Sequence, residues 1–260
     1  MEPSLSQIIH WARQAGAILR EGVGKRHTIG FKTDSDLVTE IDQRTETFII
    51  EQIRSQFPDH TIVGEESGRL EGHARACWYI DPVDGTTNYA HGLPYFCVSI
   101  AFADELGSRL GVVYDPMLDE VFSAERGKGT WLNDRPIHVS DVQELKRSLV
   151  VTGFSHNEPD VTRVNNVLSV LVNDRVQSLR RMGSSALNQA YVAAGRMDAY
   201  WELLVKPWDI GAGVLLVQEA GGIVTRLHSS REGLLEPPCD LLAATPAIYA
   251  ELLHLLSQPI

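Results

Sequence analysis

The chain has 260 residues, 43% of them hydrophobic and 22% charged, which is enough for one large domain or two closely packed halves. Its formal net charge of −11 at pH 7 disfavours a nucleic acid or an anionic membrane as the main partner, because both are negatively charged. Three cysteines without paired spacing, no N-terminal signal pattern and no apolar run of about 18 residues predict a cytoplasmic protein with free thiols.

The first half of the chain is predicted to begin with helices and to continue as a series of strands. Apolar residues at helical spacing predict helices over 4–21 and 39–56. A short strand over 61–63 and an apolar run over 77–80, typical of a buried strand, follow. Alternating runs separated by Gly, Asp or Pro turns predict four more strands: 96–103, 109–114, 119–124 and 129–132.

A charged polar segment near 140–147 is followed by a region in which strands and helices alternate. Its predicted strands are 148–153, 176–181, 197–203, 222–227 and 241–244, and its predicted helices are 160–173, 185–195, 209–220 and 246–257. Such alternation favours a partly parallel sheet covered by helices. We therefore predict an α+β half over 1–143 and an α/β half over 144–260, with a cleft between them.

Residues 77–88 are the most informative part of the chain. The predicted strand ends in two carboxylates, Asp81 and Asp84, and Pro82 stiffens the bend between them. If both stay charged about 4 Å apart near a protein surface, they repel by roughly 4 kcal/mol. A raised pKa, a basic neighbour or a cation has to offset that repulsion, and no Lys or Arg occurs between 78 and 95. We therefore favour a cation, and carboxylate oxygens suit a hard divalent one.

The residues that follow this acidic pair are suited to a phosphate group. Gly85 lets the backbone approach a ligand closely, and Thr86 with Thr87 can start a helix. The free N–H groups at such a helix start suit a phosphate oxygen. One segment able to hold both a metal and a phosphate predicts metal-assisted phosphate chemistry.

Further acids occur at the ends of predicted elements: Asp42, Glu65, Glu66 and Asp209. Each of them has an ordinary explanation when it is taken alone. An Asp before a helix is usually a cap, which we favour for Asp209 by roughly four to one. A Glu-Glu pair in a loop is usually solvated surface.

Taken together, four segments resemble the inositol monophosphatase family of Mg²⁺-dependent, lithium-sensitive sugar-phosphate phosphatases. Residues 36–42 resemble the family's first acidic motif, and 64–66 resemble its Gly-Glu-Glu. Residues 81–88 resemble its Asp-Pro-Ile-Asp-Gly-Thr-x-Asn, and 208–213 resemble its Trp-Asp-x-Ala-Ala-Gly. The motifs occur in the right order over most of the chain. The resemblance implies the sugar phosphatase fold, a layered helix–sheet sandwich with the active site between two halves.

The resemblance also implies the composition of the site. Two or three Mg²⁺ ions would be held by Glu65, Asp81, the carbonyl of Val83, Asp84 and Asp209. Asp42 and Thr86 would position or deprotonate the attacking water, with Glu65 or Glu66 assisting. The backbone of Gly85 and Thr86 would hold the phosphate, with Asp84 and Thr87 beside it. Water would attack directly, without a covalent phospho-enzyme.

On the substrate side, Glu202 matches a family acid that binds a sugar hydroxyl. Gly183, Ser184 and Ser185 match a Gly-Thr-Ala-like segment of the same pocket, and the two serines stand where Thr and Ala are frequent. The implied substrate is a polyol monophosphate, with inositol 1-phosphate first. Histidinol phosphate, fructose 1,6-bisphosphate and 3′-phosphoadenosine 5′-phosphate remain alternatives, because family pockets overlap.

Members of this family are commonly homodimers, so the resemblance implies a homodimer here. A different class of function also follows from it, since some bacterial members are thought to bind a partner such as the transcription machinery. Every expected metal position is filled in this chain, which favours catalysis.

Overall fold

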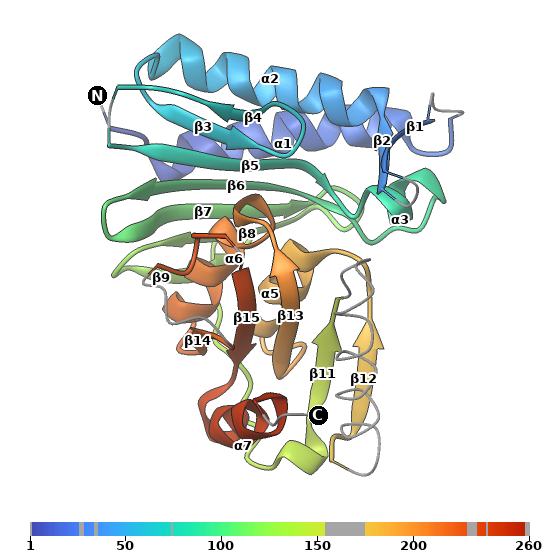
Figure 1. Ribbon diagram of the computed structural model, residues 1–260, viewed down its shortest axis with the longest axis vertical. Helices are drawn as coiled ribbons and strands as arrows, with labels where there is room; N and C mark the ends of the chain where they lie inside the picture. The colour runs from blue at the N-terminus through green and yellow to red at the C-terminus, as the bar shows by residue number, and fades with distance from the viewer. Residues whose placement is uncertain are drawn as a thin grey trace.

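The computed structural model describes residues 2–25, 29–33, 36–73, 75–153, 175–227, 233–237 and 239–257. Within them, helices and sheets alternate in layers (Figure 1). Helices α1 (Leu5–Gly22) and α2 (Glu40–Gln56) form the first layer, and α5 (Ser185–Ala193) with α6 (Pro207–Glu219) forms the third. Two sheets are the second and fourth layers, and α7 (Pro246–Leu256) is the fifth. This arrangement confirms the predicted layered mixture of helices and sheets.

The second layer is an eight-stranded sheet with strand order β10-β9-β8-β7-β6-β5-β3-β4. Its strands are β3 (Thr61–Gly64), β4 (Gly68–Leu70), β5 (Cys77–Asp84), β6 (Cys97–Asp104), β7 (Gly107–Asp115), β8 (Glu120–Glu125), β9 (Gly129–Leu132) and β10 (Arg135–Pro136). Only β3 and β5 pair in parallel within this sheet; its other neighbours are antiparallel. Every strand predicted in this region is present. Strands β4 and β10 were not predicted, because each is too short to show a periodic pattern in the sequence.

Apolar positions of α1 and α2 pack on one face of this sheet. Ile8 of α1 and Ile49 of α2 are fully buried in one cluster with Trp78 and Ile100 of the sheet. Burial of one such side chain contributes about 1.5–3 kcal/mol. These contacts hold α2 in place, and the first turn of α2 carries Asp42.

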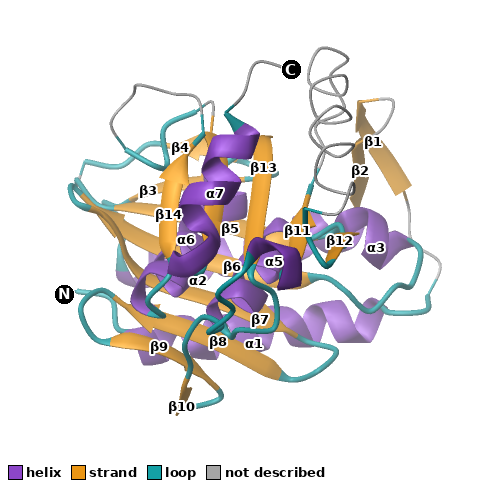
Figure 2. Cartoon of the chain, turned by 90° about the horizontal axis from the view of Figure 1, so that it is seen from below, coloured by secondary structure: helices purple, strands orange, loops and turns teal. Residues whose placement is uncertain are grey.

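The fourth layer is a five-stranded sheet with strand order β12-β11-β13-β15-β14. Its strands are β11 (Leu149–Thr152), β12 (Ser178–Arg181), β13 (Ala199–Val205), β14 (Ile223–Arg226) and β15 (Cys239–Ala244). The pairs of β11 with β12 and β13 are parallel and the rest are antiparallel, which agrees with the partly parallel sheet predicted. Helix α7 covers its outer face (Figure 2), where Ile248 and Leu252 are buried in one cluster with Trp201 and Leu242. The predicted helix over 160–173 lies outside the described residues.

Helices α5 and α6 join the two sheets through a shared core. One cluster contains Val113 and Phe122 of the first sheet, Leu187 of α5, Leu216 of α6 and Tyr200 of the second sheet. The division into halves at residues 143 and 144 stays a prediction. The two sheets lie on either side of it in sequence, but their apolar faces share this core.

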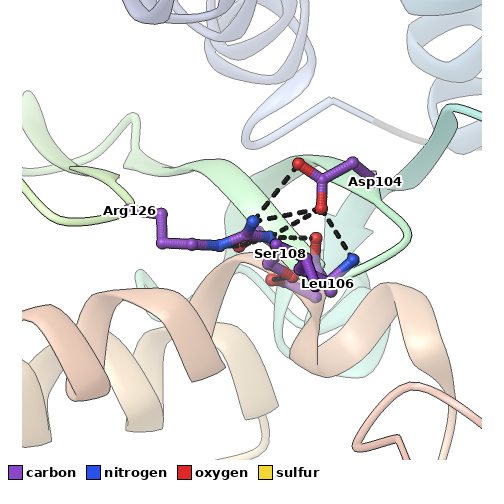
Figure 3. Close-up of polar contacts among 6 residues, drawn as sticks. Asp104, Leu106, Ser108 and Arg126 are labelled. Carbon is purple, nitrogen blue, oxygen red and sulfur yellow. Dashed lines mark hydrogen bonds and ion pairs between the residues drawn. The ribbon is translucent and has the colours of Figure 1, made fainter.

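One arginine fixes the turn between β6 and β7 (Figure 3). Arg126 donates hydrogen bonds to Asp104 and to the carbonyl oxygens of Gly107 and Ser108, at 3.0, 2.5 and 2.7 Å. Asp104 also accepts from the amide of Leu106 at 2.9 Å. These contacts set the register of the hairpin at the end of β6 remote from Cys97.

Several short elements were not predicted. Strands β1 (Ile29–Thr33) and β2 (Asp36–Thr39) form an antiparallel ribbon beside the first acidic motif, with a register irregularity near its turn. The 3₁₀ turn η1 (Leu145–Arg147) before β11 is another, whereas the five-residue helix α3 (Thr86–Ala90) begins where the sequence allows a helix to start. In the part of the chain that the structure describes, no helix is long and apolar enough to cross a membrane.

Candidate active site

The two acids of the Asp-Pro-Val-Asp segment lie at a bulge in β5. The sequence predicted that this strand ends at Ile80, but it continues to Asp84. Asp81 pairs with Ser99 of β6 and Asp84 pairs with Cys97, so three steps on β5 face two steps on β6. In a regular strand, residues three apart point to opposite faces, and the extra residue of a bulge removes that alternation. The bulge therefore allows both carboxylates to face the same side.

Gly85 turns the chain directly after Asp84. Its φ of 102° lies in the left-handed region, which glycine adopts without strain, and it precedes the first residue of α3. A Cβ at this position would lie 3.0 Å from the carbonyl oxygen of Tyr95 and 3.2 Å from that of Gly183. The turn thus places the start of α3 against a segment about 100 residues away in sequence.

Four acids from three parts of the chain are close enough to affect one another's charge. Burial raises the pKa of Asp81 well above its usual value, and the charges of Glu65, Asp84 and Asp209 raise it further. Burial also raises the pKa of Asp209, followed by the charges of Asp84 and Glu65. The sequence predicted that these four side chains meet at one site, and the structure brings them together.

The Asp84 carboxylate is held by the start of α5. It accepts hydrogen bonds from the Ser184 hydroxyl at 2.5 Å and from the amides of Ala186 and Ser185 at 2.6 and 3.1 Å. The Cys97 thiol lies 3.6 Å from the same carboxylate. Burial raises the pKa of Asp84, while these donors lower it. The Ser184 side chain is buried and donates to Asp84, and its place in the substrate pocket stays a prediction.

Asp42 and Thr86 are in direct contact across 44 residues of sequence. The Thr86 hydroxyl lies 3.1 Å from Asp42 Oδ1 and 3.0 Å from the carbonyl oxygen of Val83. Asp42 Oδ2 accepts from the amide and hydroxyl of Thr39 at 2.9 and 2.5 Å, and the bond from the amide is half of the capping box of α2. Burial raises the pKa of Asp42 against the lowering effect of these bonds.

The Gly-Glu-Glu segment lies in the turn between β3 and β4, beside an acid that the sequence did not indicate. The amide of Glu66 donates to Glu46 Oε1 at 3.0 Å, and the amide of Glu65 donates to the carbonyl oxygen of Ile80 at 3.2 Å. A Cβ on Gly64 would overlap the Glu46 carboxylate. Glu46 is buried, and burial raises its pKa. A Glu within an amphipathic helix is ordinarily solvent-exposed, so only the fold reveals this one.

Asp209 lies at the start of α6, two residues later in the helix than the sequence predicted. Its carboxylate accepts from the amide of Lys206 at 2.7 Å, so it contributes to the capping box from the third helical position, whereas the N-cap role favoured for it taken alone belongs to Lys206. The chain enters α6 through Leu204, whose φ of 56° is unusual for a side chain of this type. Gln189 of α5 donates to the carbonyl oxygens of Ser185 and Asp209 at 3.0 and 3.1 Å. This amide group connects the starts of the two central helices.

Glu202 extends from β13 toward the start of α5. Its Oε2 accepts from the hydroxyls of Tyr200 at 2.5 Å and Ser185 at 2.8 Å. A Cβ on Gly153 would overlap its carboxylate, so the absence of a side chain there leaves the space that Glu202 fills. Burial raises the pKa of Glu202, and the two hydroxyls lower it.

Asn88 joins α3 to the segment before α5. Its Nδ2 donates to the carbonyl oxygens of Tyr95 and Met182 at 2.7 and 2.8 Å. Gly183, with a φ of 85°, and Thr87 are both exposed beside it. The sequence includes Asn88 in its motif, but its role as a connector required the fold.

The donor set consists of carboxylate and carbonyl oxygens, which suit Mg²⁺ better than zinc. Within the described residues, no three His, Cys, Asp or Glu side chains form a ready-made metal site. The acids instead accept hydrogen bonds from the protein while they share a buried region of negative charge. A cavity of about 660 Å³ lies elsewhere, between the β6–β7 turn, α6 and residues 233–236, and contains none of the predicted site acids. The site is therefore suited to a divalent cation by its oxygen ligands, although these ligands do not form a complete coordination shell.

These buried acids make the stability of the metal-free protein depend on pH. The pKa is raised in the folded state for Asp42, Glu46, Asp81, Asp84, Glu202 and Asp209. A raised folded pKa means that the folded protein binds protons that the unfolded chain, with values near 4, has released. That stabilisation is complete below the unfolded values and is lost as the pH rises through the folded ones.

We expect the melting temperature in EDTA to fall as the pH rises from about 5 to 8, and Mg²⁺ to restore most of the loss at pH 8. Differential scanning fluorimetry at fixed ionic strength measures both. A melting temperature that rises steadily over this range in EDTA would contradict the charge coupling.

Comparison with known proteins gave three consistent findings. The model of the inositol monophosphatase family matches residues 1–259. The chain is 43% identical to the Nus factor SuhB of Pasteurella multocida, covering 98% of this chain and 96% of that protein. It is 39% identical to the Nus factor SuhB of Escherichia coli K12, covering 97% and 95%.

Solved structures give the same result. The extragenic suppressor protein SuhB of Bartonella henselae superposes with a TM-score of 0.92 at 33% identity over 98% of both chains. An inositol monophosphatase of Thermotoga maritima superposes with a TM-score of 0.87 at 34% identity, covering 97% of this chain and 96% of that one. The predicted sugar phosphatase fold is thereby confirmed.

Proposed function

The chain belongs to the inositol monophosphatase family, and on that premise we propose that it is a Mg²⁺-dependent phosphomonoester hydrolase acting on a polyol or sugar monophosphate. Inositol 1-phosphate is the first candidate substrate. The single observation that carries the proposal is the hydrogen bond between Thr86 and Asp42, next to the four coupled acids. This arrangement supports a proposal in which the groups that position the nucleophile and those that hold a cation share one strand end.

The proposed metal ligands are Glu65, Asp81, the carbonyl oxygen of Val83, Asp84 and Asp209. When bound, two or three Mg²⁺ ions would lower the pKa of a coordinated water and neutralise charge on the phosphoryl oxygens. Glu66 lies next to Glu65 and is the proposed assisting acid. These assignments follow the family motifs and are supported by the shared negative charge of the buried acids.

Thr86 and Asp42 are proposed to handle the proton of the attacking water. The Thr86 hydroxyl has one proton and two nearby acceptors, Asp42 Oδ1 and the Val83 carbonyl oxygen. When it donates to Asp42, its lone pairs are free to accept a hydrogen bond from water. Burial raises the pKa of Asp42, which makes this carboxylate a better final acceptor for the proton.

The phosphate is proposed to lie on the backbone amides of Gly85 and Thr86, with Asp84 and Thr87 beside it. Glu202 is proposed to bind a hydroxyl of the substrate, in a pocket that includes residues 183–185. Family pockets accept overlapping substrates, so histidinol phosphate, fructose 1,6-bisphosphate and 3′-phosphoadenosine 5′-phosphate are the alternatives.

Phosphate release from these four esters, with and without Mg²⁺, tests the proposal. We expect Mg²⁺-dependent turnover, highest on inositol 1-phosphate and inhibited by tens of millimolar LiCl. If turnover is highest on another ester, the proposed reaction stands and that ester replaces inositol 1-phosphate as the substrate. Equal release with Mg²⁺ and with EDTA would contradict the proposed chemistry.

A second candidate function is a regulatory binding role, because relatives that are 38–43% identical are named Nus factors. This role is compatible with the first, since a binding surface and an active site can occupy different faces of one fold. Absence of turnover on every ester would leave the binding role as the main function. A homodimer remains part of the proposal through family membership, and a cytoplasmic location through the free cysteines and the sequence pattern.

A further inference from the structure

Ser185, the first residue of α5, contacts an acid on each side of the candidate site. Its amide donates to Asp84 Oδ1 at 3.1 Å, and its hydroxyl donates to Glu202 Oε2 at 2.8 Å. Asp84 is a proposed metal ligand and Glu202 a proposed substrate contact. One residue therefore spans the two functional parts of the site.

The two hydrogen bonds that the Glu202 carboxylate accepts both reach the same oxygen. Its Oε2 accepts a second hydrogen bond, at 2.5 Å, from the hydroxyl of the buried Tyr200. The carboxyl group also fills the space beside Gly153. Within the described residues, no group donates a hydrogen bond to Oε1. Among the described residues, Glu202 therefore has one oxygen that accepts two hydrogen bonds and one that accepts none.

The backbone of Ser185 is fixed relative to the second helix start as well. Its carbonyl oxygen accepts from Gln189 Nε2 at 3.0 Å, and the same Nε2 donates to the carbonyl oxygen of Asp209 at 3.1 Å. Gln189 is fully buried, which limits its rotation. The position of the Ser185 hydroxyl is thus set by contacts with both Asp84 and α6.

We propose that Ser185 is a specificity-determining positioning residue, which orients Glu202 so that Oε1 receives one substrate hydroxyl at a set distance from the phosphate. The inference rests on the proposed function. It favours monophosphates that carry a hydroxyl at that distance over esters that carry none, because only the former can donate a hydrogen bond to Oε1. Ser185 would act through Glu202, without touching the reacting phosphorus itself.

The test compares two esters with the full chain and saturating Mg²⁺. Inositol 1-phosphate has hydroxyls that can reach Glu202, whereas p-nitrophenyl phosphate has none. For Ser185→Ala we expect the KM for inositol 1-phosphate to rise about tenfold more than the KM for p-nitrophenyl phosphate, since one hydrogen bond to a charged group is lost. Tyr200→Phe should shift the same ratio in the same direction.

Two further variants separate orientation from general damage. Ser185→Thr keeps the hydroxyl and should restore the KM ratio. In the Glu202→Gln background, adding Ser185→Ala should change the ratio less than twofold, because the group being positioned is already altered.

The outcomes distinguish the inference from the proposed function. An active wild type with equal KM changes on both esters in Ser185→Ala would overturn the inference alone. A wild type that hydrolyses neither ester, nor any other of the panel, would overturn the proposed function and the inference together.

Discussion

Replacing Asp81 by asparagine is expected to lower kcat/KM by about 10³-fold or more, while it raises the melting temperature of the metal-free protein. The loss follows from the proposed role of Asp81 as a metal ligand, because metal stabilisation of the transition state is worth several kcal/mol and about 1.4 kcal/mol is tenfold in rate. The gain in stability has a separate cause. Burial and the charges of Glu65, Asp84 and Asp209 already oppose ionisation of Asp81.

Asparagine can keep the local contacts of the carboxylate. Asp81 Oδ1 accepts from the amide of Val83 at 3.0 Å, and the amide oxygen of Asn can do the same. Its Nδ2 can donate to the neighbouring Glu65, whose charge raises the pKa of Asp81. Removal of a repulsion of roughly 1–4 kcal/mol is therefore not offset by lost hydrogen bonds.

Thermal melts in EDTA and in Mg²⁺ measure this prediction directly. The wild type should gain stability with Mg²⁺, and the variant should gain much less. Glu51→Gln is the matched control, because it removes one charge from an exposed position of α2 and should leave both readouts nearly unchanged. A variant that melts lower than the wild type in EDTA would contradict the charge repulsion.

Replacing Thr86 by valine is expected to lower kcat by about 10²- to 10⁴-fold with little change in KM, the range typical of a positioned acid–base group. Valine has nearly the same shape and lacks only the hydroxyl that contacts Asp42 and Val83. The capping box of α2 does not depend on Thr86, because Asp42 contacts Thr39 through Oδ2 and Thr86 through Oδ1. The fold should therefore remain intact.

Steady-state kinetics on the preferred ester, together with circular dichroism, provide the measurement. Thr86→Ser keeps the hydroxyl and should retain most of the activity. Asp42→Asn is a less clean probe, since it also disturbs two hydrogen bonds that start α2. Retention of more than a tenth of wild-type kcat by Thr86→Val would rule out the proposed proton path.

The sequence was sufficient to predict the helices and strands that show a clear periodic pattern, and to identify the acids of the candidate site. The apolar stripes of α1 and α2 and the alternation of the sheet strands are local signals, so their positions could be predicted within a few residues. The end of β5 was misplaced because a strand with Pro82 inside it is normally interrupted. A bulge accommodates the proline, and no local sequence pattern predicts a bulge at this position.

The contacts that organise the site could not be predicted in the same way. Asp84 is held by residues 184–186, a full hundred positions later, and such a contact leaves no local period. Glu46 looked like a surface residue of an amphipathic helix, although Gly64 leaves room for its carboxylate. Ser185 was assigned to the pocket by motif alone, and its contact with Glu202 became visible only in three dimensions.

The hold of the α5 start on Asp84 has a consequence for how this lineage can change. Its carboxylate accepts hydrogen bonds from the polypeptide itself, as do the capping acids Asp42 and Asp209, so these local contacts are made by the protein alone. A gene copy that loses one ligand therefore keeps its shape and its exterior. A binding surface can then be retained by selection after catalytic activity is lost, so single substitutions can convert an enzyme with this fold into a binding protein.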